Sequence, residues 1–115
     1  MSKQGNIRKI LFICSGNKKR SPTAEEIYRK EKSLLVRSAG TSKKAKHEVT
    51  LEDIKWADII FVMEKKHEQR IKANFNIPLM RKEIHVLDIP DNYVYMESEL
   101  VEILKSKVNT ILGLN

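Results

Sequence analysis

The stretch ILFICSGNKKRSP, residues 10–22, decides the fold that this sequence predicts. Its first four residues are apolar and too few for a helix, which indicates a buried strand. Ser21 and Pro22 then predict a helix, because serine caps helices and proline suits their first turn. A strand therefore ends in a short loop that opens a helix, with Cys14 first in the loop and Arg20 six residues later.

The rest of the chain alternates in the same way between short apolar runs and helical patterns. Apolar strands separated by helices are typical of a parallel sheet that is covered on both faces. We therefore expect an α/β fold of three layers, with a four-stranded parallel sheet flanked by helices. The expected strands are residues 9–13, 34–38, 58–63 and 83–87. Helices are expected from Ser21, from Thr50 with Asp53 completing its cap, over residues 64–74, and over residues 97–111 with Leu100, Leu104, Val108 and Ile111 on the apolar face.

The length and composition exclude several classes of protein. A chain of 115 residues predicts a single domain over residues 1–115, with a flexible polar start at residues 1–6. The single cysteine rules out an internal disulfide and favours the reducing cytoplasm. The apolar run of residues 56–63 contains Asp58 and is too short to cross a bilayer, so we expect no contact with a membrane.

The charge of the chain predicts an anionic partner. The formal net charge is +7, and lysines concentrate at residues 18–19 and 43–46. Aromatic residues are not interleaved with these basic runs, as a surface that stacks bases would require. Nucleic acid is therefore not the partner that the sequence favours.

The cysteine loop has the parts of an anion site. A cysteine attacks as its thiolate, which needs donors and positive charge around it. The loop offers amides at a helix N-terminus, the Arg20 guanidinium and the Ser21 hydroxyl. The same groups suit a phosphate, because a planar guanidinium can clasp two of its oxygens. Gly16 and Asn17 tolerate the left-handed backbone angles that turn successive amides inward.

The segment LFICSGNKKRSPTAE, residues 11–25, closely resembles the cysteine loop of low-molecular-weight protein tyrosine phosphatases and their arsenate reductase relatives. The pattern Cys-x5-Arg is weak by itself, but the internal glycine and asparagine and the following Ser-Pro-x-Ala-Glu make it specific. Residues 38–41 (SAGT) and 57–64 (ADIIFVME) resemble the family as well, so the resemblance covers most of the chain. It implies a four-stranded parallel sheet flanked by helices.

The resemblance also implies a role for each residue of the loop. Cys14 would attack phosphorus to form a phosphocysteine, and Arg20 would bind the equatorial oxygens. Ser21 would hydrogen-bond the thiolate, while Asn17 would hold the shape of the loop with support from Ser38. The expected phosphate-binding residues are Ser15, Gly16, Asn17, Lys18, Lys19, Arg20 and Ser21.

The family also uses an aspartate, placed before a proline and an aromatic residue, to protonate the leaving group and then to activate water. Asp91 resembles it, with Asn92 in the place of the proline, and is the preferred acid. Asp88 is the alternative acid, or else it orients the loop. Tyr93 would either flank a substrate ring or pack over the loop, and both alternatives stay open.

Two departures from the family pattern concern the substrate. Lys19 stands where members carry a second cysteine, so no disulfide can form within the loop. Together with Lys18 it makes the loop mouth more cationic, which favours anionic or multiply charged substrates. The segment between Thr41 and Thr50 is much shorter than in the family, lacks the aromatic loop that flanks the substrate and omits a helix.

We therefore predict a cysteine-dependent phosphomonoester hydrolase that acts on a phosphorylated protein or a small aryl phosphate and holds inorganic phosphate or another oxyanion in its loop. The prediction needs no metal or organic cofactor, and His47, His67 and His85 show no metal-ligand spacing. A monomer or weak dimer is expected. Two alternatives stay open: an arsenate reductase that uses an external thiol, and a catalytically weak module that binds phosphate or phosphoproteins.

Overall fold

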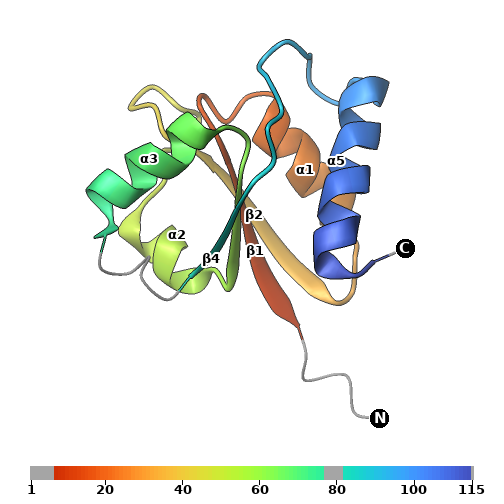
Figure 1. Ribbon diagram of the computed structural model, residues 1–115, viewed down its shortest axis with the longest axis horizontal. Helices are drawn as coiled ribbons and strands as arrows, with labels where there is room; N and C mark the ends of the chain where they lie inside the picture. The colour runs from red at the N-terminus through yellow and green to blue at the C-terminus, as the bar shows by residue number, and fades with distance from the viewer. Residues whose placement is uncertain (1–6, 77–81, 115) are drawn as a thin grey trace.

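The computed structural model describes residues 7–76 and 82–114, and it places a parallel sheet between two pairs of helices (Figure 1). The strands pair in the order β2-β1-β3-β4, and every pair is parallel. They are β1 (Arg8–Cys14), β2 (Leu34–Gly40), β3 (Ile59–Val62) and β4 (Glu83–Val86). The helices are α1 (Arg20–Tyr28), α2 (Leu51–Trp56), α3 (Lys65–Asn74) and α5 (Ser98–Leu112). The predicted α/β fold is confirmed, whereas the single domain over residues 1–115 stays a prediction and residues 1–6 lie outside the described part.

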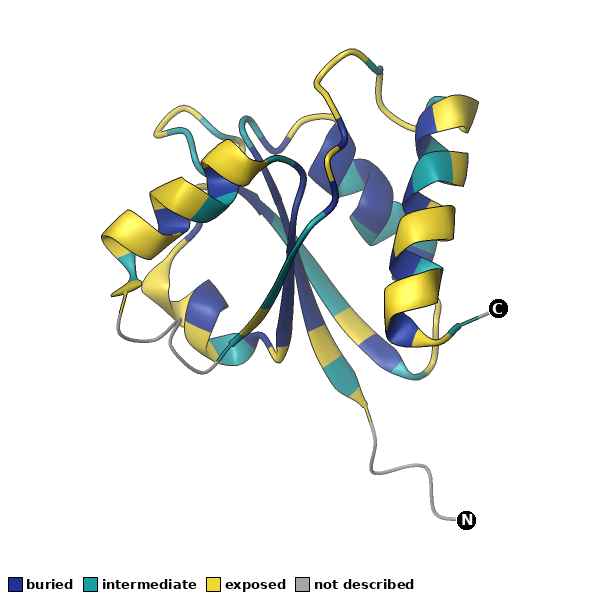
Figure 2. Cartoon of the chain, in the orientation of Figure 1, coloured by how far each residue is buried: buried dark blue, intermediate teal, exposed yellow. Residues whose placement is uncertain are grey.

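Two apolar clusters, one on each face of the sheet, hold the three layers together (Figure 2). Successive side chains of a strand point to opposite faces. In β1, Ile10, Phe12 and Cys14 therefore join the cluster beneath α1 and α5, while Leu11 and Ile13 join the cluster beneath α2 and α3. Cys14 is thus the last core residue of β1.

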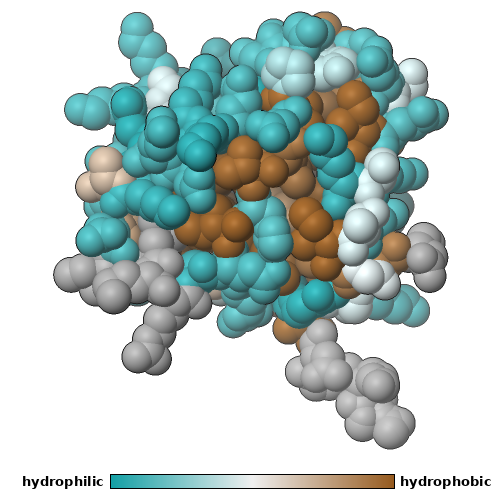
Figure 3. All heavy atoms as spheres, viewed as in Figure 1, coloured by the Kyte–Doolittle hydropathy of each residue, from teal (hydrophilic) through white to brown (hydrophobic). Residues whose placement is uncertain are grey.

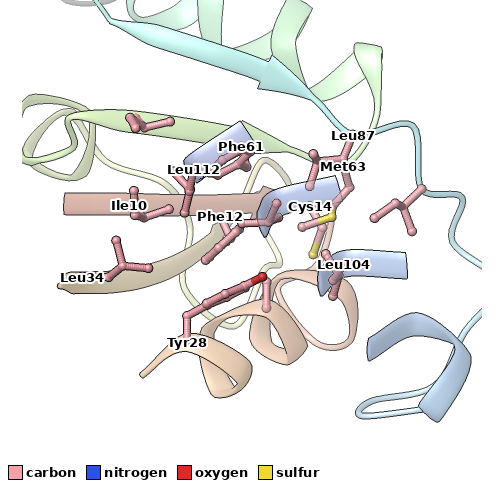
Figure 4. Packing of buried hydrophobic residues seen from close by; sticks show 14 of the residues in the cluster. Ile10, Phe12, Cys14, Tyr28, Leu34, Phe61, Met63, Leu87, Leu104 and Leu112 are labelled. Carbon is pink, nitrogen blue, oxygen red and sulfur yellow. The ribbon is translucent and has the colours of Figure 1, made fainter. Parts of the chain in front are cut away.

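The position of Cys14 follows from the direction of the strands. It is 2% exposed and lies within its cluster near Met63 (Figure 4). The carboxyl ends of parallel strands meet at one edge of the sheet, which is where such folds bind ligands. The loops that follow β1, β3 and β4 therefore gather around Cys14.

The apolar face of α5 differs from the predicted one at its C-terminal end. Leu100, Leu104 and Val108 are buried as predicted, but the next buried residue is Leu112, and Ile111 is 37% exposed. The stripe continues in steps of four to the end of the helix, where Gly113 forms a left-handed cap. The prediction for Ile111 was wrong by one position.

One face of the molecule can be seen in the space-filling view (Figure 3). Figure 3 shows polar side chains over most of the viewed face, with an apolar area near its middle. Among residues 7–76 and 82–114, no helix has the length and apolar character needed to cross a membrane.

Candidate active site

The cysteine loop is tied by its backbone to the segment that follows β2. Three hydrogen bonds of 3.0 Å join them, from the amides of Thr41, Ser42 and Lys46 to the carbonyl oxygens of Cys14, Ser15 and Gly16. Because each peptide is planar and trans, the amide that follows a carbonyl points in the opposite direction. The N–H groups of residues 15–17 therefore face away from that segment, as a cradle for an oxyanion requires.

Gly40 lets the end of β2 approach this loop. A Cβ atom at residue 40 would lie 2.4 Å from the Ser15 carbonyl oxygen and 2.7 Å from the Ala45 Cβ. We expect Gly40→Ala to displace the loop and to lower the free energy of unfolding in urea by about 2–3 kcal/mol. Gly16→Ala is the control, because Gly16 does not adopt the left-handed angle predicted for it and its Cβ would lie 3.9 Å from the nearest side-chain atom. Equal unfolding midpoints for the two variants would contradict the expectation.

A hydrogen-bond network shapes the loop beneath Cys14. Asn17 adopts a left-handed φ of 55° and donates from Nδ2 to Ser21 Oγ at 2.9 Å and to Ser38 Oγ at 3.0 Å. Ser38 in turn donates to Glu25 Oε1 at 2.5 Å. The structure thus brings Asn17, Ser21 and Ser38 together, as predicted, and adds Glu25 as a partner that the sequence did not indicate.

Ser21 does not cap the helix, contrary to the prediction. Helix α1 begins at Arg20, with Lys19, two residues before Ser21, in the cap position and no side-chain cap. The Ser21 hydroxyl instead lies 3.0 Å from Cys14 Sγ and donates to the Ala39 carbonyl oxygen at 3.2 Å. Its single proton can turn towards the sulfur when the sulfur is a thiolate, since a charged acceptor makes the stronger hydrogen bond.

Arg20 is fixed from one side, which leaves its other edge free. The side chain is 1% exposed, and Nη1 donates to Glu64 Oε1 at 2.8 Å and to the Ile89 carbonyl oxygen at 2.7 Å. The bond from Arg20 lowers the pKa of the Glu64 carboxyl and so keeps it ionised. Neither bond uses Nε or Nη2, whose parallel N–H groups can bind two oxygens of one oxyanion. Nε is buried without a hydrogen-bond partner in the described chain.

Cys14, Arg20 and Asp91 line one small hollow of about 160 Å³, together with Gly16, Lys18 and Lys19. Asp91 Oδ1 lies 3.8 Å from Arg20 Nε, so the preferred acid stands at the rim of the site. Ser15, Asn17 and Ser21 do not line this hollow with their side chains and belong to the loop and the network beneath it.

Asp88 and Tyr93 belong to the same loop after β4 as Asp91, but they do not line the hollow of Cys14 and Arg20. Asp88 is exposed, adopts a left-handed φ of 56° and lines a separate hollow with Lys65 and Pro90. Tyr93 is half-buried against the cluster beneath α1 and α5, which is the packing alternative. In the described ranges, no three His, Cys, Asp or Glu side chains are grouped as metal ligands would be.

His67 holds the loop from α3, a role that its spacing in the sequence did not indicate. The ring is 1% exposed, and its Nδ1 accepts a hydrogen bond of 3.0 Å from the Glu64 amide. Nε2 therefore carries the proton and donates it to Ser15 Oγ at 2.8 Å. Burial, and then the charge of Arg20, lower the pKa of His67 to about 4, so the ring is neutral at neutral pH.

The lowered pKa of His67 makes folding depend on pH. Between the ordinary pKa of 6.5 and the folded pKa of about 4, only the unfolded state binds the extra proton. The free energy of unfolding therefore falls as the pH drops through this range, by up to about 3 kcal/mol. In urea unfolding, His67→Gln should lose less free energy of unfolding between neutral pH and pH 4 than the wild type does. The control variant His85→Gln should lose as much as the wild type. An unchanged loss in His67→Gln would contradict this account.

The chain is similar to known phosphatases in part of its sequence and in its fold. Residues 9–54 match the model of the low molecular weight phosphotyrosine protein phosphatase family, and no curated protein matches the chain. Similar solved structures include YwlE arginine phosphatase from Geobacillus stearothermophilus, with 20% identity, 92% of this chain and 94% of that chain covered, and a TM-score of 0.72. SP-PTP, a low molecular weight protein tyrosine phosphatase from Streptococcus pyogenes, has 18% identity, coverage of 93% and 92%, and a TM-score of 0.75. The tyrosine phosphatase Wzb from Escherichia coli K30, solved with phosphate, has 21% identity, coverage of 93% and 97%, and a TM-score of 0.71.

These findings confirm the family resemblance that the cysteine loop predicts. The matched segment contains the whole loop, β2 and most of α2. At identities below 25%, the solved structures establish the fold and leave the substrate to be argued from the site. The family whose model residues 9–54 match is a phosphatase family, so arsenate reduction is not the favoured alternative.

Proposed function

We propose that this chain, whose residues 9–54 match the low molecular weight phosphotyrosine protein phosphatases, is a cysteine-dependent phosphomonoester hydrolase. The observation that supports the proposal most directly is the small hollow shared by Cys14 and Arg20. It combines a nucleophile with a buried N–H group of Arg20 that has no hydrogen-bond partner in the described chain, although the Asp91 carboxylate lies 3.8 Å away. An unsatisfied charged donor is costly unless an oxyanion completes it.

In the first step, the Cys14 thiolate attacks phosphorus while the bond from phosphorus to the ester oxygen breaks. The leaving oxygen takes the electron pair of that bond and a proton from Asp91. The Nε–Nη2 edge of Arg20 and the amides of residues 15–17 bind the three non-bridging oxygens, whose charge they stabilise through the transition state.

In the second step, the Asp91 carboxylate removes a proton from water, and the water oxygen attacks phosphorus. The sulfur–phosphorus bond breaks, and inorganic phosphate and the Cys14 thiolate are released. The Ser21 hydroxyl donates to this thiolate as it leaves. The cycle is balanced without a metal or an organic cofactor.

The substrate class of this proposal is a phosphorylated protein or a small aryl phosphate. Lys18 and Lys19 at the rim of the hollow attract such anions. A cytoplasmic location and a monomeric or weakly dimeric state belong to the same proposal. The location rests on the single cysteine, which is typical of proteins in a reducing compartment.

Hydrolysis of p-nitrophenyl phosphate by the purified protein tests the proposal. Turnover should be inhibited by vanadate and competitively by inorganic phosphate, because both oxyanions would occupy the hollow. The competing function is a module that binds phosphate without catalysis, which the short segment after β2 favours. Vanadate binding in a calorimeter with no turnover on any phosphoester would favour that module and reject the hydrolase.

A further inference from the structure

A second and larger hollow, of about 580 Å³, adjoins the cysteine loop. It lies between the loop, α1 and the segment that contains Tyr95, and Lys18 lines both hollows. A group attached to a phosphoryl at Cys14 can therefore extend past Lys18 into it. Its volume lies in the range of sites that hold a ligand larger than a single ion.

The charges around this second hollow leave two lysines without a partner. Of its two acidic residues, Glu26 pairs with Arg29 at 2.9 Å, and Glu25 accepts a hydrogen bond from the neutral Ser38 hydroxyl and keeps its charge. The lining therefore holds three cationic side chains and two carboxylates. Within residues 7–76 and 82–114, neither Lys18 nor Lys46 has a carboxylate within 4.0 Å. The hollow thus presents two free ammonium groups to whatever enters it.

Lys46 reaches this position because the segment after β2 is short. Its amide donates to the Gly16 carbonyl oxygen at 3.0 Å, so its backbone runs directly beside the cysteine loop. Tyr95, which is 50% exposed, lines the same hollow, and the next amide, of Met96, is held to α1 by a 2.9 Å hydrogen bond to Thr23 Oγ1. Cationic and aromatic groups therefore face one hollow from two anchored segments.

We propose that this second hollow binds an acidic residue that neighbours the phosphorylated residue of a peptide substrate. The inference rests on the proposed hydrolase function and narrows its substrate class. Lys18 and Lys46 would pair with the acidic side chain, while the Tyr95 ring would pack on the adjoining backbone. A peptide is favoured over a small bisphosphate because the hollow also offers Tyr95 and is much larger than the cysteine hollow.

The test compares phosphotyrosine peptides that are identical except for Glu or Gln at positions flanking the phosphotyrosine. The wild type should prefer the best-placed Glu peptide by about five-fold in kcat/KM, the size expected for an exposed ion pair. Lys46→Gln should reduce this ratio to about one to two. Lys44→Gln is the matched control, because it removes the same charge from the same exposed segment but does not line the hollow, and its ratio should stay at the wild-type value.

Each failure has a different signature. Equal kcat/KM for Glu and Gln peptides in the wild type would overturn the acidic subsite and leave the hydrolase function intact. A small bisphosphate preferred over its monophosphate, with no difference between the peptides, would overturn the peptide as occupant. If no phosphoester is turned over, the hydrolase proposal fails, and calorimetry of the same peptides with Cys14→Ser still decides the subsite: tighter binding of the Glu peptide supports it, and equal binding rejects it.

Discussion

Replacing Cys14 by serine should lower kcat for p-nitrophenyl phosphate by about 10⁴-fold or more, since removing a catalytic nucleophile has effects of that order. A hydroxyl is a far weaker nucleophile than a thiolate at neutral pH. The surroundings of the sulfur are built for an anion, with the Ser21 hydroxyl at 3.0 Å and the amides of residues 15–17 facing away from the segment behind them.

The serine variant is a sharp test because it changes one atom at a site that is 2% exposed. Its circular dichroism and urea midpoint should stay close to those of the wild type, so a lost rate would report chemistry. Cys14→Ala should be as inactive as Cys14→Ser. Turnover within ten-fold of the wild type in either variant would show that hydrolysis does not pass through this sulfur.

Asp91→Asn should lower kcat by about 10²–10³-fold on a phosphoester with a poor leaving group, such as phenyl phosphate. The amide can neither protonate the leaving oxygen nor take a proton from water. Asp91 is placed for both tasks, because it lines the hollow of Cys14 and its carboxylate lies 3.8 Å from Arg20 Nε. The loss in the first step should be smaller for p-nitrophenyl phosphate, whose leaving oxygen needs less help from an acid.

Asp88→Asn is the matched control for this prediction. It makes the same chemical change in the same loop, and asparagine tolerates the left-handed φ of 56° that Asp88 adopts. Asp88 lines a different hollow, so kcat for phenyl phosphate should change by less than about three-fold. A larger loss in Asp88→Asn than in Asp91→Asn would transfer the role of the acid to Asp88.

The parts of the fold that depend on neighbours in the sequence could be predicted. The apolar runs located all four strands, and the capping box of Thr50 and Asp53 is present, with hydrogen bonds of 3.1 Å and 3.0 Å between them. The cap expected at Ser21 was wrong because its hydroxyl is used by tertiary partners, Cys14 and Ala39. The capping rule uses only residues that are neighbours in the sequence, so it does not take such tertiary partners into account.

Sequence patterns report only on residues that are close in the chain, and this decides which residues of the candidate site could be predicted. Cys14, Arg20 and the loop between them are contiguous, so their motif could be recognised. Glu64 and His67 become partners of the loop only because β3 pairs with β1 and delivers the start of α3 beside it. No spacing within the sequence encodes that proximity.

The central claim is that a phosphoryl group passes through the sulfur of Cys14. The most direct measurement is quenching of Asp91→Asn in an alkaline denaturant during turnover of p-nitrophenyl phosphate, because the sulfur–phosphorus bond is labile in acid, followed by mass spectrometry of the peptide that contains Cys14. Slow hydrolysis of the intermediate in this variant should leave that peptide heavier by one phosphoryl group, and the modification should be absent in Cys14→Ser under the same conditions. An unmodified Cys14 peptide, quenched while the variant is still releasing p-nitrophenol in a burst, would contradict the account.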